Sequence, residues 1–149
     1  IKYVDKIFEV AETEDFIYID KMFTDEYTGS VYTKKLKGAL PKVKANMSQG
    51  IPEMIEIATE KRWKEDFENK HKKKAGRGWY RYNTRFALPV MNEKGDISDY
   101  NVYQAVLVVR YAMDGKLYLY DIQNIKKETR YPLWTEKSNG QKPVSFNSV

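Results

Sequence analysis

The chain has 149 residues, a formal net charge of +5 and no cysteine, which allows one hydrophobic core and excludes disulfides and thiolate metal sites. No apolar run approaches the ~18 residues of a membrane span, and Ile1–Asp20 alternates charged with apolar side chains, unlike the apolar core of a signal peptide. We expect one domain over residues 1–149 without membrane anchoring, and a start at Ile1 is typical of a fragment of a longer chain.

The positive charge is concentrated in the middle and C-terminal parts of the sequence. The net charge is −3 over residues 1–60, +5 over residues 61–77 and +3 over residues 78–149. This asymmetry raises the local potential where a polyanion such as RNA could dock. The alternative is a solvated basic loop, which is what a lysine run such as Lys72–Lys74 commonly forms.

The first part of the chain is predicted to be an arm followed by helices. Residues 1–29 form the expected arm, in which Phe16–Ile19 is either a short strand or extended chain. Apolar residues then recur every three or four positions over Val31–Met47, and Pro41 predicts a kink or two short helices. A further helix is expected over Ile51–Phe67 because its apolar residues continue this spacing.

The periodicity changes from helical in residues 30–70 to alternating in residues 79–126. Glycine-containing turns at Asn92–Asp96 and Asp114–Gly115 predict two consecutive hairpins. Residues 130–149 have no clear period and are expected to form an irregular tail. The predicted fold is α+β, with N-terminal helices packed on a C-terminal antiparallel β-meander. Its three strands are expected at Trp79–Val90, Tyr100–Tyr111 and Leu117–Ile125.

Alternation along the first of these strands separates two faces. Tyr82, Thr84 and Phe86 are predicted to face the core. Arg81, Asn83 and Arg85 lie on the other face, about 6–7 Å apart in succession, where two guanidinium groups could hold a phosphate while the amide contacts a base or sugar. An ordinary solvated sheet surface is the alternative.

His71 is the single histidine and lies within a lysine-rich segment. An imidazole can accept or donate a proton near neutral pH, and lysines beside it would help to hold a phosphate. An exposed histidine in a solvated loop is the alternative. No cluster of His, Cys or carboxylate residues has metal-ligand spacing, so neither a metal site nor a cofactor is expected.

The predicted third strand ends close to Lys126, Lys127 and Thr129. A lysine there could neutralise the charge of a phosphorane, and the threonine could donate a hydrogen bond to a phosphate oxygen. A charged, protected sheet edge would use the same lysines. The sequence lacks a glycine-rich phosphate loop, a GxSxG elbow and an HExxH motif, which disfavours nucleoside-triphosphate, serine-hydrolase and zinc-protease chemistry.

Over roughly residues 30–130, the sequence resembles a C-terminal domain of large phage and mobile-element polyproteins. That domain is similar to the barnase–EndoU–colicin E5/D–RelE (BECR) class of nucleases. The resemblance rests on Met54–Thr59, Lys61–Trp63, His71, Gly78–Pro89, Leu119–Ile122 and Ile125–Thr129.

The resemblance implies a BECR/barnase-like fold and metal-independent RNA cleavage through a 2′,3′-cyclic phosphate. It implies the catalytic residues His71, Arg85, Lys126 and Thr129. It implies the RNA-binding residues Arg81, Asn83, Lys127, Lys72, Lys73 and Tyr82. Similar domains often carry a histidine at the position of Tyr111, so a tyrosine substitute, a single-histidine mechanism and a weakened enzyme remain as alternatives.

The resemblance also implies a biological setting. The expected protein is a bacterial or phage-borne toxin module that acts in the target-cell cytoplasm on RNA, with tRNA one candidate, and that a cognate immunity protein inhibits. A non-catalytic nucleic-acid-binding or phage-packaging accessory domain is the main alternative. An ADP-ribosylating or other nucleotide-using toxin is a third, although the sequence shows no cofactor pocket for it.

Overall fold

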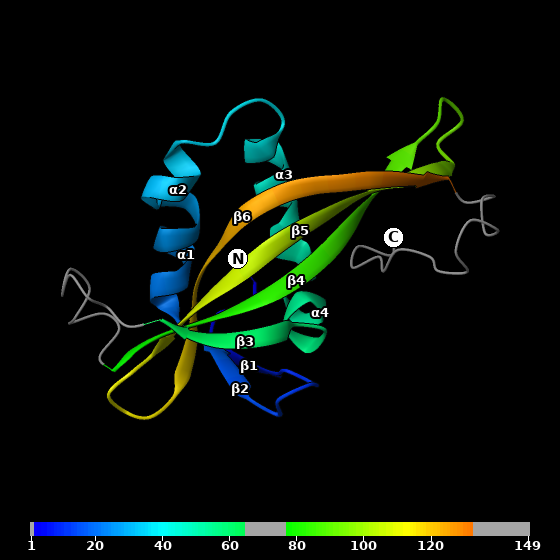
Figure 1. Cartoon of the computed structure of the whole chain (residues 1–149). Coiled ribbons are helices and arrows are strands. Elements are labelled where there is room, and N and C mark those ends of the chain that lie inside the picture. Colours follow the sequence, from blue (N-terminus) through cyan, green and yellow to red (C-terminus); the bar gives the residue numbers. More distant parts are fainter. Residues whose placement is uncertain (1, 65–76, 133–149) are drawn as a thin grey trace.

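A computed structural model of the chain describes residues 2–64 and 77–132 (Figure 1). Its helices are α1 (Lys21–Gly29), α2 (Val31–Lys34), α3 (Leu40–Met47) and α4 (Ile51–Glu56), with a 3₁₀ turn η1 (Ser48–Gly50) before α4. Its strands are β1 (Lys6–Glu9), β2 (Phe16–Ile19), β3 (Thr59–Lys64), β4 (Gly78–Met91), β5 (Ile97–Tyr111) and β6 (Leu117–Pro132). The predicted α+β class is confirmed. None of the helices in these two ranges is long and apolar enough to cross a membrane.

The described strands form one six-stranded sheet in the order β1-β2-β6-β5-β4-β3. Neighbouring strands are antiparallel, except that β2 and β6 pair in parallel. The long strands β4, β5 and β6 form a three-stranded meander, and Figure 1 shows it curving past the helices and projecting beyond them. The order of elements differs from the prediction, because β1 and β2 precede the helices and β3 follows them.

Two predicted segments in the first half of the chain need correction. Residues 1–29 are not only an arm, since they contain the strands β1 and β2 and the helix α1. The helix expected to continue to Phe67 ends at Glu56, and β3 begins three residues later. The interval from Ala58 to Trp63 is five residues, which breaks the helical period. The indole of Trp63 packs on Tyr80 of β4 instead, with ring centroids 4.9 Å apart.

The remaining boundaries follow from prolines, glycines and strand pairing. The Val31–Met47 region divides into α2 and α3, and Pro41 lies in the first turn of α3, where its missing amide is tolerated. Gly95 and Gly115 have φ of 84° and 81° in the two predicted hairpin turns, a conformation that glycine adopts without steric cost. Strand β6 extends to Pro132, so the tail prediction is wrong for residues 130–132, and the rest of it lies outside the described residues.

The core lies between the helices and one face of the sheet. Its fully buried side chains include Phe23, Met47, Ile51, Met54, Ile55, Tyr82, Phe86, Leu107 and Ile122. Thr84 is also buried on this face, and its hydroxyl donates to the carbonyl of Met54 in α4 at 2.7 Å. The alternation predicted for β4 is therefore confirmed, and Arg81, Asn83 and Arg85 lie on the face away from α4.

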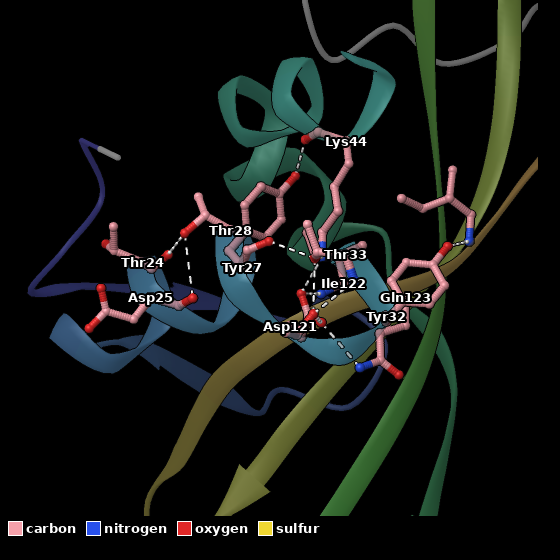
Figure 2. A network of polar contacts seen from close by, with 12 residues as sticks. Thr24, Asp25, Tyr27, Thr28, Tyr32, Thr33, Lys44, Asp121, Ile122 and Gln123 are labelled. Carbon is pink, nitrogen blue, oxygen red and sulfur yellow. Dashed lines mark hydrogen bonds and ion pairs between the residues drawn. The ribbon is translucent and has the colours of Figure 1, made fainter. Parts of the chain in front are cut away.

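A buried ion pair joins the helices to β6 (Figure 2). Lys44 Nζ lies 2.6 Å from Asp121 Oδ1, and the two side chains are only 2% and 0% exposed. Ser30 Oγ and Gln123 Nε2 donate to Asp121 Oδ2 at 2.8 Å and 3.1 Å. Lys44 Nζ also donates to the hydroxyl of Thr33. Removing either charge would leave the other buried and unpaired.

Two tyrosine rings complete the surroundings of this lysine. Lys44 Nζ lies 4.6 Å from the ring centroid of Tyr27 and 5.3 Å from that of Tyr32, both within the range of a cation–π contact. Burial lowers the pKa of Lys44, although the charge of Asp121 opposes this shift. Burial and the same carboxylate raise the pKa of Tyr27. The cluster is closed and internally hydrogen-bonded, which suits it to stabilising the fold.

Candidate nucleic-acid interface

A pocket of about 610 Å³ lies where β3, β4, β5 and β6 run side by side. It is lined by Ile57, Thr59, Glu60, Asn83, Thr84, Arg85, Gln104, Ala105, Val106, Asn124 and Lys126. Arg85 lies directly opposite Gln104, and Gln104 lies directly opposite Lys126. Because cross-strand partners point to the same face, these three side chains form one polar row on the face away from α4.

Two β-bulges frame this pocket. The register between β3 and β4 gains one residue between Thr59 and Arg62, and that between β5 and β6 gains one between Gln123 and Lys126. Each bulge contains a pocket residue with positive φ that is not glycine, Glu60 at 55° and Asn124 at 53°. Such conformations cost free energy and often occur at functional sites, where a bulge re-aims a side chain.

The second bulge determines which residue of β6 enters the pocket. Without the extra residue, Ile125 would lie opposite Gln104 on the open face. With it, Ile125 turns into the core, where it is 6% exposed, and Lys126 takes the place opposite Gln104. Lys126 is exposed, and no carboxylate within the described residues forms an ion pair with it.

Three contacts hold Glu60 in its left-handed conformation. Its amide donates to Glu12 Oε2 at 3.2 Å, and its carbonyl accepts from Arg62 Nη1 at 3.0 Å. Its carboxylate accepts a hydrogen bond from Asn83 Nδ2 across the pocket. The carboxylate is thus fixed in position while its only hydrogen-bond partner among the described side chains is a neutral amide.

A second carboxylate lies beside the pocket and engages Arg85. Arg85 Nε donates to Glu128 Oε2 at 2.8 Å, and Gln104 Nε2 donates to Glu128 Oε1 at 3.0 Å. The side chain of Arg85 is 47% exposed, so water screens this ion pair and its contribution to stability is small. An incoming phosphate could therefore replace Glu128 on the guanidinium at modest cost.

The structure brings together three of the residues predicted for function, Asn83, Arg85 and Lys126, which all line the pocket. Arg81 lies on the same face two residues before Asn83, outside the pocket lining. The other predicted residues do not line the pocket within the described part of the chain.

Two predicted RNA-binding residues, Lys127 and Tyr82, lie on the face of the sheet opposite the pocket. Lys127 is paired with Tyr103, which belongs to the core, so its side chain points away from the pocket. Tyr82 is fully buried, and its hydroxyl donates to Asp15 Oδ2 at 2.6 Å.

The remaining predictions concern residues of which the structure describes less. Thr129 of β6 pairs with Val102 of β5, but the side chain of Thr129 is not among those described. His71, Lys72 and Lys73 lie outside the described residues, so their roles stay predictions.

Tyr111, the position at which the resemblance leads us to expect a histidine, lies far from the pocket. It is seven residues from Gln104 along β5, which corresponds to about 23 Å. Its hydroxyl accepts from Arg77 Nη1 at 3.0 Å, and its ring packs against Trp63 and Tyr80. The identity of this residue therefore does not bear directly on the chemistry of the pocket.

Four residues at or beside the pocket were not predicted from the sequence: Glu60, Gln104, Asn124 and Glu128. The helical spacing places Glu60 in the helical half. The long-range pairing that brings Gln104 and Asn124 into the pocket, and Glu128 beside it, leaves no local pattern in the sequence. In the described ranges, no three His, Cys, Asp or Glu side chains are grouped so that they could hold a metal ion. Comparisons of the chain with protein-family models, with curated proteins and with solved structures gave no match.

Proposed function

We propose that this pocket binds RNA and cleaves it without a metal ion, as a BECR-type ribonuclease toxin module. The observation that carries the proposal is the convergence of Arg85, Lys126 and Asn83 with the carboxylate of Glu60 in one pocket between two bulges. Cations that hold a phosphate and a fixed carboxylate that accepts a proton are the groups this reaction requires. Helices on the other face of a curved, largely antiparallel sheet also fit a barnase-like arrangement.

The proposed reaction is an attack by a ribose 2′-hydroxyl on the adjacent phosphorus. The O2′–P bond forms as the P–O5′ bond breaks, which leaves a 2′,3′-cyclic phosphate and a 5′-hydroxyl. Glu60 accepts the proton of the 2′-hydroxyl, and Arg85 and Lys126 stabilise the charge on the non-bridging oxygens. Asn83 orients Glu60 and the sugar. His71 is the proposed donor of the proton that O5′ acquires.

The biological setting forms part of the same proposal. A bacterial or phage-borne module of this kind would act on RNA in the target cell, and an immunity protein would inhibit it by covering the pocket. The net charge of +5 over residues 61–77 supports attraction of a polyanion.

The test is to incubate the purified chain with tRNA and with single-stranded RNA in the presence of EDTA, from pH 5 to pH 8. We expect products with 2′,3′-cyclic phosphate ends, and no cleavage of the same oligonucleotide with 2′-O-methyl riboses. Glu60→Gln preserves the shape and the contact with Asn83, and should lower the rate about 10²–10⁴-fold. His71→Ala tests the proton donor separately. Intact RNA across this pH range would refute the proposal.

The second candidate is a non-catalytic RNA-binding or phage-packaging accessory domain. It is favoured by the ion pair between Arg85 and Glu128, which occupies the guanidinium group that cleavage would need for the scissile phosphate. Both functions predict binding that weakens with salt, so binding alone does not separate them. The accessory function would be established if the wild type and Glu60→Gln both bind RNA tightly and both leave it uncut.

A further inference from the structure

Two arginines lie on neighbouring strands beside the pocket, directly opposite each other. Arg62 of β3 lies directly opposite Arg81 of β4. The bulge at Glu60 produces this arrangement, because without the extra residue Lys61 would occupy the position opposite Arg81. No ion pair joins either arginine to a carboxylate of the described residues. Like charges directly opposite each other destabilise a sheet, so this pairing is unfavourable for the free protein.

The guanidinium of Arg81 also lacks a hydrogen bond that it needs. Its Nε is buried and has no hydrogen-bond partner among the described residues. On the other side of β4, the residue opposite Arg81 is the apolar, buried Val108, whose side chain offers no acceptor. Burial and the nearby charge of Arg62 both lower the pKa of Arg81. A buried donor without a partner destabilises the folded chain, and two unneutralised guanidinium groups beside it make an anion the most favourable addition to this site.

The position of the pair indicates which anion would supply this acceptor. Arg62 Nη1 donates to the carbonyl of Glu60 at 3.0 Å, which holds that guanidinium at the edge of the pocket. Arg81 precedes Asn83 by two residues and Arg85 by four on the same face, or about 7 Å and about 13 Å along the strand. The arginine pair and the pocket are therefore neighbouring cationic sites along one strand of the sheet.

We propose that Arg62 and Arg81 bind a further phosphate of the RNA strand whose scissile phosphate occupies the pocket. This subsite rests on the proposed function of the pocket and specifies its substrate as a single-stranded oligonucleotide rather than a mononucleotide. The phosphate lies between the two guanidinium groups and accepts hydrogen bonds from both, which removes the repulsion between them.

The test measures binding by the intact chain of 2′-O-methyl oligoribonucleotides from one to six nucleotides long, which lack the hydroxyl needed for cleavage. We expect the affinity of the wild type to rise with the number of phosphates. Arg81→Met keeps the aliphatic stem of the side chain. It should lower the affinity for the longer oligonucleotides about tenfold and leave the affinity for the mononucleotide almost unchanged. The slope of log affinity against log salt should fall by about one. Lys94→Gln, at the exposed β4–β5 turn, is the matched control.

The outcomes separate this subsite from the pocket. If Arg62→Met and Arg81→Met leave the rise with length intact, or weaken every length equally, the subsite is refuted. Arg85→Ala should weaken all lengths, and its failure to do so would refute the pocket instead. Because the free arginines repel each other, Arg62→Met should leave the unfolding midpoint unchanged or raise it. A clear fall in that midpoint would assign the pair a structural role and contradict the proposal.

Discussion

The buried lysine cluster and the open face of the sheet use similar side chains in opposite ways. At Lys44, the carboxylate of Asp121, a hydroxyl and two tyrosine rings surround the ammonium group. Lys126 lines the pocket and Arg81 belongs to a like-charged pair, and Arg81 Nε has no acceptor among the described residues. The first cluster satisfies its charges internally and excludes ligands.

This difference teaches which charged residues to assign to stability and which to function. An internally satisfied, buried pair contributes to folding only while both partners are present. Cations at the surface that have no carboxylate partner contribute little to folding, whether exposed as Lys126 or half-buried as Arg81, but they can bind an anion without first losing an internal ion pair. Substitutions in the two regions should therefore affect different measurements.

The largest expected effect is on stability, from breaking the buried pair. Lys44→Met leaves the carboxylate of Asp121 buried without its cation, which should cost about 3–5 kcal/mol in the free energy of unfolding. Urea denaturation monitored by circular dichroism measures this loss. Lys42→Met, at an exposed position in the same helix, should have little effect. Addition of Asp121→Asn to Lys44→Met should recover part of the loss, and a loss below about 1 kcal/mol for Lys44→Met would contradict this account.

The next effect is on activity, from the open face. Lys126→Ala removes a cation that stabilises the charged transition state and should lower the RNA-cleavage rate about 10²-fold. The free energy of unfolding should change little, because Lys126 is exposed. Lys127→Ala changes the adjacent lysine, which points to the other face, and should lower the rate less than about threefold. Equal losses for the two variants would mean that general positive charge, rather than the pocket, determines the rate.

The sequence predicted those features that depend on local spacing. Alternation along β4 placed Arg81, Asn83 and Arg85 on one face, and two glycine turns located the hairpins of the meander. The position of Lys126 in the pocket depends on an extra residue at Asn124. A single inserted residue reverses every side chain after it, and no glycine marks this bulge. A count along the strand therefore could not determine the face of Lys126.

Long-range partners were equally inaccessible to sequence reasoning. Lys44 and Asp121 are separated by 77 positions, and neither is distinguishable in the sequence from an exposed charged residue. Glu60 was assigned to a helix because the apolar spacing of α4 appeared to continue past Ala58. Pairing with β4 outweighs that local preference, since it adds a ladder of backbone hydrogen bonds and packs Trp63 on Tyr80.

A third effect concerns Asp15, a carboxylate that is less buried than Asp121 and less exposed than the charges of the open face. Burial raises the pKa of Asp15, but hydrogen bonds from Thr13, Tyr82 and Lys61 outweigh it and hold this pKa below its usual value of 3.8. A lowered carboxyl pKa stabilises the fold above about pH 4, and this contribution is lost as the pH falls through the folded-state pKa. Asp15→Asn should therefore lower the free energy of unfolding by about 1 kcal/mol at neutral pH.

The difference in the free energy of unfolding between Asp15→Asn and the wild type should become smaller as the pH falls from about 5 to about 2. Urea denaturation at a series of pH values measures it. Asp25→Asn, at an exposed position in α1, serves as the control and should show no such narrowing. A constant difference at all pH values would mean that Asp15 contributes through packing rather than through its charge.

The smallest effect on stability is expected at the exposed carboxylate of Asp114. Tyr118 donates a hydrogen bond of 2.6 Å to Asp114 Oδ2 at the β5–β6 turn. This bond raises the pKa of Tyr118 to about 12, and together with the amide of Lys116 it lowers the pKa of Asp114. Tyr118→Phe should return the pKa of Asp114 toward 3.8 while the unfolding midpoint stays unchanged, because solvent screens the carboxylate. A carboxyl NMR titration measures the shift, and a lowered midpoint would show that even exposed charges stabilise this sheet.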